Sequence, residues 1–277
     1  MAIVAHQTRF GVYGRPVLAW LVALLFFFPI FWMVLTSFKT DADAVKPEFL
    51  FFFTPTLENY ANMTENYDYW RFAANSVITS VLATILTLIV AIPAAYAMAF
   101  NPSRATKDVL MWMLSTKMLP AAGVLYPMTF LTKSLGLFDT HFLVIFVLSL
   151  INLPIVIWML FTYFKEIPKD IIEAGQMDGV STWGEVREIL IPLAWGGIVS
   201  TALLCFIFCW NEAYWTVRLT TTDAATLSKL IEGNRAPEGL FFGRLSAVSA
   251  AAVGPIVVLG WFCQKQLVQG LTFGAVK

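Results

Sequence analysis

Charged side chains are scarce in this sequence of 277 residues. Asp, Glu, Lys and Arg make up 13% of it, about half of the share typical of a soluble domain, whereas 58% is hydrophobic. The 18 basic and 18 acidic residues give a net charge of zero, and no block of like charge occurs. These absences argue against a nucleic-acid-binding surface and against a disordered acidic tail. A membrane is therefore the expected solvent, and no nucleic acid is expected as a partner.

Residues that bind metals or nucleotides are also few. The three cysteines lie in apolar stretches, where a thiol behaves as a small hydrophobic group, so we expect them to be packing residues. The two histidines lie far from them in sequence. No Gly-Lys pair occurs, which excludes a phosphate-binding loop of the Gly-x-x-x-x-Gly-Lys-Ser/Thr type. We expect no metal and no cofactor, and any energy source must lie outside this chain. The residues concerned are Cys205, Cys209, Cys263, His6 and His141.

Long apolar runs between charged residues are the main feature that is present. A membrane-spanning helix needs about 20 mostly apolar residues, and six such runs occur. We predict an all-α integral membrane protein with six transmembrane helices in a single domain, residues 1–277, with both termini on one side. The first run is too long for a signal peptide and is expected to be a retained anchor. The predicted spans are 16–38, 75–100, 108–131, 142–164, 194–217 and 245–265.

The loops do not orient the protein by charge, because Lys and Arg are almost equally divided between the two sides. The segment Lys39–Arg71 differs in kind from the other loops. It is long, carries the aromatic run Phe49–Phe53 and contains several Tyr and Trp residues. Such composition is typical of a segment at the level of the lipid headgroups, so membrane lipid is an expected partner.

Residues 165–192, between the fourth and fifth spans, are predicted to form two short helices joined by a turn. Pro168 suits the first turn of a helix, where its missing N–H costs nothing, and Asp170 suits the positive end of the helix dipole. The first helix would include residues 171–178. Gly179 would end it as a left-handed cap.

The second helix is predicted to begin at Thr182. Thr182 and Glu185 have the spacing of a capping box, in which each side chain accepts a hydrogen bond from an amide of the other's segment. The helix would end near Ile191-Pro192. On these observations alone, an ordinary amphipathic hairpin with solvated acidic side chains is an alternative.

This hairpin resembles the EAA loop of permease subunits in binding-protein-dependent ABC importers. The family pattern reads Glu-Ala-Ala, three residues later Asp-Gly-Ala, then Phe, Ile and Leu-Pro, and the spacing agrees throughout. The matching residues are Glu173-Ala174-Gly175, Asp178-Gly179, Ile189 and Ile191-Pro192. The departures are Gly175 for the second Ala, Val180 for the third, Val186 for the Phe and Ile191 for the Leu.

The resemblance implies a function and an orientation. In that family the loop is cytoplasmic and docks as a short helix into a cleft of the ATPase subunit, which would place both termini of this chain in the cytoplasm and the protein in the cell inner membrane. The implied partners are a related second permease subunit, two copies of an ABC ATPase and an extracytoplasmic solute-binding protein. The implied coupling residues are Glu173, Ala174, Gly175, Asp178 and Gly179. The chain itself would not be an enzyme.

The chain as a whole is similar to carbohydrate-uptake permeases of the maltose type. The similarity lies in the spacing of the spans, the long loop after the first span and the ending Gly270–Lys277. Thr116–Pro120 and Trp210–Trp215 look most like the branch that imports sugar alcohols such as sorbitol and mannitol. The implied solute is a small neutral sugar or polyol.

Ionisable side chains within spans are costly and are candidates for function. Lys117 is predicted near the middle of the third span and Glu212 near the end of the fifth, where a pairing or capping role is equally open. A polyol requires neutral hydrogen-bonding groups and aromatic faces. Pro120, Pro127 and Pro154 are expected to interrupt regular helix bonding where the backbone lines a cavity. The candidate pathway residues are Lys117, Asn152, Trp210, Asn211, Glu212 and Tyr214.

Two other classes of membrane protein remain as alternatives. A secondary transporter usually has internal repeats and intramembrane ion-coupling groups, but residues 1–140 and 141–277 show no convincing repeat. A non-transport intramembrane protein with enzymatic activity would need a catalytic set, and His141 has only Asp139 as an acidic neighbour in sequence. An ATPase that purifies with the chain would distinguish an importer from both.

Overall fold

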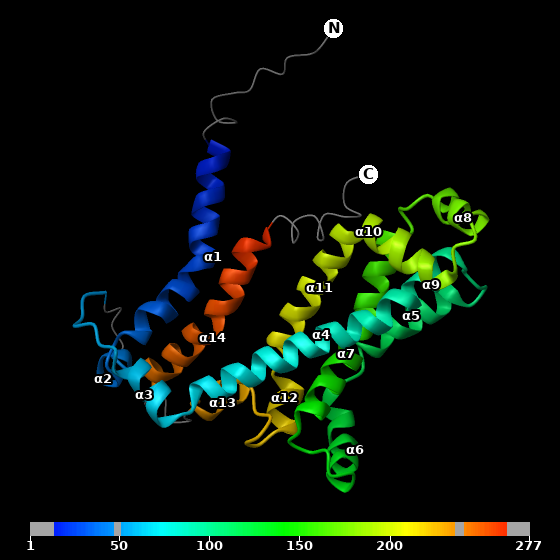
Figure 1. Cartoon of the computed structure of the whole chain (residues 1–277). Helices are drawn as coiled ribbons and strands as arrows, with labels where there is room; N and C mark the ends of the chain where they lie inside the picture. The colour runs from blue at the N-terminus through cyan, green and yellow to red at the C-terminus, as the bar shows by residue number, and fades with distance from the viewer. Residues whose placement is uncertain (1–13, 47–50, 236–240, 265–277) are drawn as a thin grey trace. The chain divides into compact units, whose positions relative to one another are not determined.

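A computed structural model describes residues 14–46, 51–235 and 241–264, and every regular element in these ranges is a helix (Figure 1). This agrees with the predicted all-α class. The longer helices are α1 Arg15–Ser37, α4 Tyr69–Phe100, α5 Thr106–Thr116, α6 Ala121–Ser134, α7 His141–Phe164, α11 Trp195–Trp210 and α14 Phe242–Phe262. The shorter ones are α2 Asp41–Ala44, α3 Glu58–Asn66, α8 Lys169–Met177, α9 Thr182–Gly184, a π-helix Glu185–Leu190, α10 Ile191–Leu193, α12 Tyr214–Leu219 and α13 Leu227–Gly233.

Four helices, α1, α4, α7 and α14, are long and apolar enough to cross a membrane. Two further pairs pass the same test only when taken together. Helices α5 and α6 are bent by 84° at their junction, and the segment Thr182–Leu193 is bent by 85° relative to α11. The described residues therefore contain four candidate spans, or up to six if each bent pair is one span.

The predicted span 108–131 is not one helix, which corrects the sequence-based expectation. Helix α5 ends at Thr116 and α6 begins at Ala121, directly after Pro120. Proline has no N–H to donate and disfavours the helical conformation of the residue before it. Pro127 and Pro154, in contrast, lie inside α6 and α7 without ending them.

The predicted span 194–217 is also interrupted. Helix α11 ends at Trp210, and α12 begins only at Tyr214. Two other spans begin earlier than predicted. Helix α4 begins at Tyr69 and not at position 75, and α14 begins at Phe242 and not at position 245. Position 265, predicted to end the sixth span, and the segment 270–277, which carried part of the family resemblance, lie outside the described residues.

The chain divides into two compact units. Of the described residues, the first contains 14–46, 51–67, 233–235 and 241–251, and the second contains 68–232 and 252–264. In the first unit, α3 fixes the end of α1. The side-chain amide of Asn59 donates to the carbonyls of Ser37 and Lys39 at 2.9 and 2.7 Å. The hydroxyls of Ser37 and Tyr60 lie 2.7 Å apart.

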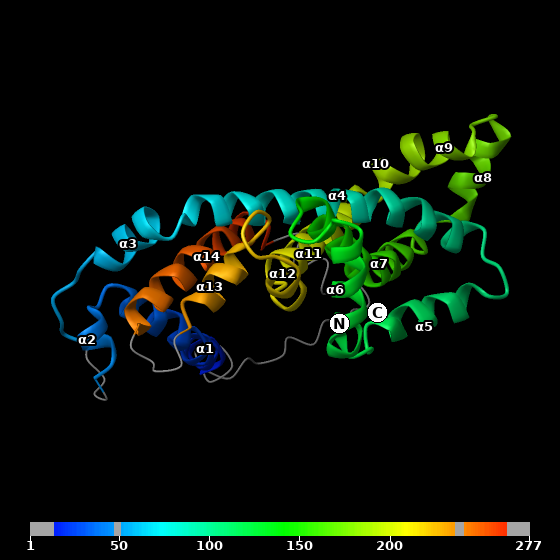
Figure 2. The same cartoon turned by 90° about the horizontal axis from the view of Figure 1, so that it is seen from below.

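The core of the second unit is formed by α4, α7 and α11, which pack against one another (Figure 2). Helix α4 turns a face of small residues toward its neighbours, with positions repeating every four residues, and this spacing permits close helix packing without bulky side chains. The Ser149 hydroxyl of α7 donates to the Ala83 carbonyl at 3.1 Å across this contact. The buried small residues on α4 are Ser76, Thr79, Ser80, Ala83, Thr84, Thr87, Ala91, Ala95 and Ala99.

The cysteines of α11 belong to this core. Cys205 is 1% exposed and Cys209 is 2% exposed, and both contribute to the main hydrophobic cluster of the second unit. This agrees with the packing role predicted for them. Cys263 is partly exposed, and all three thiols are free.

Candidate functional site

Helix α8 and the segment that follows it form a helical hairpin, which we call the α8 hairpin, residues 165–193. Helix α8 carries Asp170 in its first turn, as predicted, whereas Pro168 occupies the position just before the helix. The turn after α8 depends on Gly179, whose φ is +81°. The left-handed cap predicted at this glycine is therefore confirmed. Both views place the hairpin at one end of α7 and α11 (Figures 1 and 2).

The predicted coupling residues divide between two sides of α8. Glu173, Ala174 and Asp178 are exposed, whereas Gly175 is buried. A Cβ atom placed on Gly175 would lie 2.5 Å from Cδ1 of Ile189, so the absence of a side chain lets the two limbs of the hairpin approach closely. Glu173 and Asp178 have no ion-pair partner among the described residues.

Glu185 has a different role from the one predicted. Its side chain is buried, with 2% exposure, and accepts a hydrogen bond from the Tyr96 hydroxyl of α4. Gln176 of α8 also donates to it, at 3.3 Å. The predicted capping box of Thr182 and Glu185 is therefore wrong. The Ser181 hydroxyl caps this helix instead, accepting from the Gly184 amide at 3.2 Å.

A cavity of about 600 Å³ lies in the second unit. It is open to the outside and is bordered by the α5–α6 break, by α7 and by the break between α11 and α12. Its lining is mainly apolar, with a few polar groups, as is typical of small-molecule sites. The lining residues include Lys117, Leu119, Val124, Asn152, Phe208, Glu212, Tyr214 and Trp215. Four of the six predicted pathway residues thus meet here, namely Lys117, Asn152, Glu212 and Tyr214.

The two ionisable residues of this cavity already have backbone partners. Lys117 follows the end of α5, at the break in the bent pair rather than within a continuous helix, and its ammonium donates to the Ile151 carbonyl at 2.5 Å. The carboxylate of Glu212 accepts from the amides of Trp215 at 3.0 Å and Thr216 at 3.1 Å. Glu212 therefore satisfies amides at the start of α12, which is the capping role left open by the sequence.

Asn152, Trp210 and Asn211, which are also predicted pathway residues, each donate a hydrogen bond to a backbone carbonyl. Asn152 is 2% exposed, and its amide donates to the Leu148 carbonyl at 3.0 Å. Trp210 is buried and donates to the Ala252 carbonyl at 3.2 Å, so it ties α11 to α14. Asn211 is exposed and donates to the Ile207 carbonyl at 2.9 Å. Neither Trp210 nor Asn211 borders the cavity.

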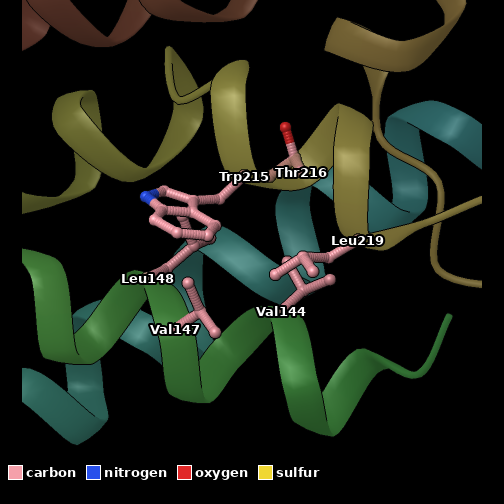
Figure 3. A pocket seen from close by; sticks show the side chains of 6 residues that line it. All are labelled: Val144, Val147, Leu148, Trp215, Thr216 and Leu219. Carbon is pink, nitrogen blue, oxygen red and sulfur yellow. The ribbon is translucent and has the colours of Figure 1, made fainter. Parts of the chain in front are cut away.

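Helix α12 is held against α7 by an apolar contact. Figure 3 shows the ring of Trp215 lying over Leu148, while the side chain of Leu219 reaches toward Val144. Because Trp215 also borders the 600 Å³ cavity, this contact fixes one of the cavity's walls. The residues around the contact are Val144, Val147, Leu148, Trp215, Thr216 and Leu219.

A loop anchor at the opposite end of α7 was not predicted from the sequence. Asp139 adopts a φ of +61°, and its carboxylate accepts from the Thr221 hydroxyl at 2.5 Å and from the amides of Thr222, Asp223 and Ala224. Burial alone would raise the pKa of this carboxyl, but these hydrogen bonds outweigh it and hold the pKa well below its ordinary value. The Gly136-x-x-Asp139 turn just before α7 is the sequence signal that could have indicated it.

Comparison with known proteins identifies the family. Residues 91–271 match the family described as binding-protein-dependent transport system inner membrane component. Because this match covers more than half of the chain, the chain belongs to that family. It is accordingly a membrane component of a transport system and not an enzyme.

Individual relatives align over nearly the whole chain. The chain is 31% identical to the probable ABC transporter permease protein y4oR of Sinorhizobium fredii, with 100% of each chain covered. It is also 31% identical to the trehalose/maltose transport system permease protein MalG of Thermococcus litoralis, with 93% of this chain and 94% of that protein covered. These matches support the resemblance to maltose-type permeases.

A solved structure shares the fold. A chain of a bacterial ABC transporter involved in the import of the acidic polysaccharide alginate matches with a TM-score of 0.74. The match covers 96% of this chain and 99% of that chain, at 21% sequence identity. The chain therefore shares the fold of that chain.

Proposed function

We propose that the chain is the permease subunit of an ATP-driven importer for a carbohydrate, and that the 600 Å³ cavity belongs to its half of the translocation pathway. In this proposal each bent pair is one span, giving six, with both termini in the cytoplasm. The partners are a related second permease, two ATPase subunits and an extracytoplasmic binding protein. The observation that carries the proposal is the cavity bordered by two helix breaks, in a chain of this family.

The α8 hairpin is the proposed contact with the ATPase. Its exposed side carries Glu173, Ala174 and Asp178, while its other side is held by Gly175 and Glu185. These carboxylates have no ion-pair partner among the described residues, so they are suited to charge-assisted hydrogen bonds with basic groups of another subunit. A rigid base with an exposed acidic face can transmit a displacement of the partner to α7 and α11.

The proposed solute is uncharged and rich in hydroxyl groups. The ammonium of Lys117 and the carboxylate of Glu212 are both engaged by backbone groups, so the charged atoms of the cavity are partly satisfied without a ligand. Neutral hydrogen-bonding groups and the rings of Tyr214 and Trp215 then remain for a solute. MalG is named for trehalose and maltose, which are such solutes.

A sugar alcohol such as sorbitol or mannitol is the narrower hypothesis from the sequence. It rests on Thr116–Pro120 and Trp210–Trp215 alone, and the relatives described above are named for trehalose, maltose and alginate. An oligosaccharide is the alternative within the same class. Because alginate is acidic, the charge of the solute is the point that an experiment must decide.

The test is uptake by the complete complex in proteoliposomes, with the binding protein on one side and ATP on the other. Sorbitol, mannitol, trehalose, maltose and an acidic oligosaccharide would each be offered as radiolabelled solutes. Uptake of a polyol or neutral sugar is the expected result. Uptake of only the acidic solute would contradict the proposal. The chain alone should neither hydrolyse ATP nor transport, because it lacks a nucleotide-binding loop.

A further inference from the structure

The first unit contains a buried cation that lacks a hydrogen-bond acceptor. Lys39 follows the end of α1 and is only 2% exposed. Its ammonium lies 4.2 Å from the ring centroid of Trp32 and 5.2 Å from that of Phe53. Among the described residues no oxygen accepts a hydrogen bond from it, and no carboxylate forms an ion pair with it. Aromatic faces attract a cation but accept no conventional hydrogen bond, so the N–H donors of Lys39 are available to an acceptor in the cavity that it lines.

A second unsatisfied polar group borders the same space. Lys39 and Thr36 both line a cavity of about 350 Å³. The Thr36 hydroxyl oxygen is buried and has no hydrogen-bond partner among the described residues. Two buried donors that face one cavity indicate a ligand rich in acceptor oxygens. The other lining residues are Pro29, Trp32, Met33, Asp43, Ala44, Lys46, Phe242 and Ser246.

The charges around this cavity define the charge of the ligand. Lys46 donates to the Asp43 carboxylate at 2.6 Å, so these two charges neutralise each other. Lys39 itself forms no ion pair among the described residues, so its charge is available to a ligand. Burial lowers the pKa of Lys39, while the charge of Asp43 acts in the opposite direction. A ligand with one negative charge and several oxygens would balance this site, and a phosphodiester has both properties.

The position of the cavity along α1 indicates where the ligand comes from. Helix α1 has 23 residues, and at 1.5 Å per residue it is about as long as the roughly 30 Å hydrocarbon core of a bilayer is thick. Lys39 lies just beyond its end, at the expected level of the lipid phosphates. The apolar side chains of α1 are exposed in this chain, including Trp20, Leu25 and Phe26, and could contact acyl chains.

We propose that this cavity, the Lys39 cavity, binds the phosphodiester headgroup of a membrane phospholipid. The ammonium of Lys39 and the hydroxyl of Thr36 donate to phosphate oxygens, and the rings of Trp32 and Phe242 contact the glycerol and the first methylene groups. The site is separate from the solute cavity and does not depend on which solute is carried. A bound lipid would fix the end of α1 at the membrane surface.

The experiment measures lipid binding to the complete, purified complex by native mass spectrometry. Palmitoyl-oleoyl phosphatidylglycerol is titrated into delipidated complexes that carry wild-type chain, Lys39→Met or Lys39→Arg. Lys39→Met should weaken the tightest lipid-binding step by at least about fivefold, since a single basic group near the membrane surface already contributes that much. Lys39→Arg should bind within about twofold of wild type, because arginine also pairs with phosphate.

Two controls separate this site from general lysine or lipid effects. Lys107 is exposed on α5, and Lys107→Met should bind lipid as wild type does. Ser246→Phe fills the Lys39 cavity without removing a charge and should weaken binding like Lys39→Met, whereas Ser246→Ala should not. If Lys39→Met prevents assembly, Ser246→Phe decides alone.

Inorganic phosphate distinguishes a lipid from a free anion. An excess of inorganic phosphate should not displace the bound phosphatidylglycerol, because it lacks the glycerol and acyl contacts. Displacement would show a free-phosphate site and overturn the lipid assignment. Unchanged lipid binding in Ser246→Phe, together with unchanged binding in Lys39→Met where it assembles, would overturn the proposal altogether.

Discussion

Charged side chains of the α8 hairpin and of the 600 Å³ cavity differ in whether they have partners within the chain's described residues. On the hairpin, Glu173 and Asp178 are exposed and have no ion-pair partner among the described residues. In the cavity, Lys117 and Glu212 are bound to backbone groups within 3.1 Å. This difference is the basis for proposing a charged partner for the hairpin and a neutral solute for the cavity. Each prediction below alters one side of this comparison.

The largest effect is expected when the charge on the exposed side of α8 is reversed. Glu173→Lys should reduce solute-stimulated ATPase activity and uptake by at least about tenfold, because bringing like charges together at an interface costs several kcal/mol. Membrane abundance should stay near wild type, since Glu173 is exposed.

The matched control for Glu173→Lys is Glu65→Lys, which reverses an exposed carboxylate on α3, outside the hairpin. It should retain most of the stimulated activity. The measurement is stimulated ATPase activity together with the amount of ATPase that stays on the purified complex. Normal coupling in Glu173→Lys would mean that the hairpin is a solvated connector.

The next largest effect is expected at the base of the hairpin. Tyr96→Phe removes the hydroxyl that donates to the buried Glu185, and an unsatisfied buried group costs about 1–3 kcal/mol, more when it is charged. We expect lower thermal stability of the complex and severalfold lower uptake. Glu185→Gln in the same chain should restore part of the loss, because it removes a charge that keeps only the long hydrogen bond from Gln176. Purely additive losses would argue against a direct role for this hydrogen bond.

A smaller effect is expected at the turn of the hairpin. Gly179 has a φ of +81°, and there is open space where a Cβ would lie, so only the backbone conformation opposes a side chain. Gly179→Val should therefore cost about 1–2 kcal/mol and reduce stimulated ATPase activity. Gly179→Asn is the matched control, because asparagine tolerates this conformation, and it should be nearly silent. Equal losses in both variants would locate the effect in the interface and not in the turn.

Local rules predicted one limb of the hairpin well and the other less well. The Asp170 position and the Gly179 cap follow from interactions within a few residues, and both were correct. The role of Glu185 was missed because its main partner, Tyr96, is 89 residues away in the chain. A capping-box pattern describes only residues that are neighbours in sequence. The partner of Glu185 is instead determined by the packing of α4 against the hairpin.

The cavity shows the same limit. Ionisable residues in apolar runs directed attention to Lys117 and Glu212, and the structure places both at one cavity. Their backbone partners depend on the helix breaks before α6 and before α12, and the apolar runs do not show these breaks. An interruption was expected at Pro120, Pro127 and Pro154, but only Pro120 lies at a break, and the other two lie inside helices. Only packing distinguishes them.

The smallest effect is expected at Gln176, which is exposed but also forms a hydrogen bond within the hairpin. Its side chain is exposed, yet its amide donates to Glu185 at 3.3 Å, a long hydrogen bond. Gln176→Ala should therefore be mild, with uptake within about twofold of wild type, because Tyr96 still donates to the same carboxylate. In the double variant with Tyr96→Phe, however, the loss of uptake and stability should exceed the sum of the two single losses, since Glu185 then loses both donors. Measuring uptake and thermal stability of the single and double variants tests this. A large loss in Gln176→Ala alone would mean that Gln176 belongs to the contact with the ATPase and that the exposed side of α8 extends further than Glu173, Ala174 and Asp178.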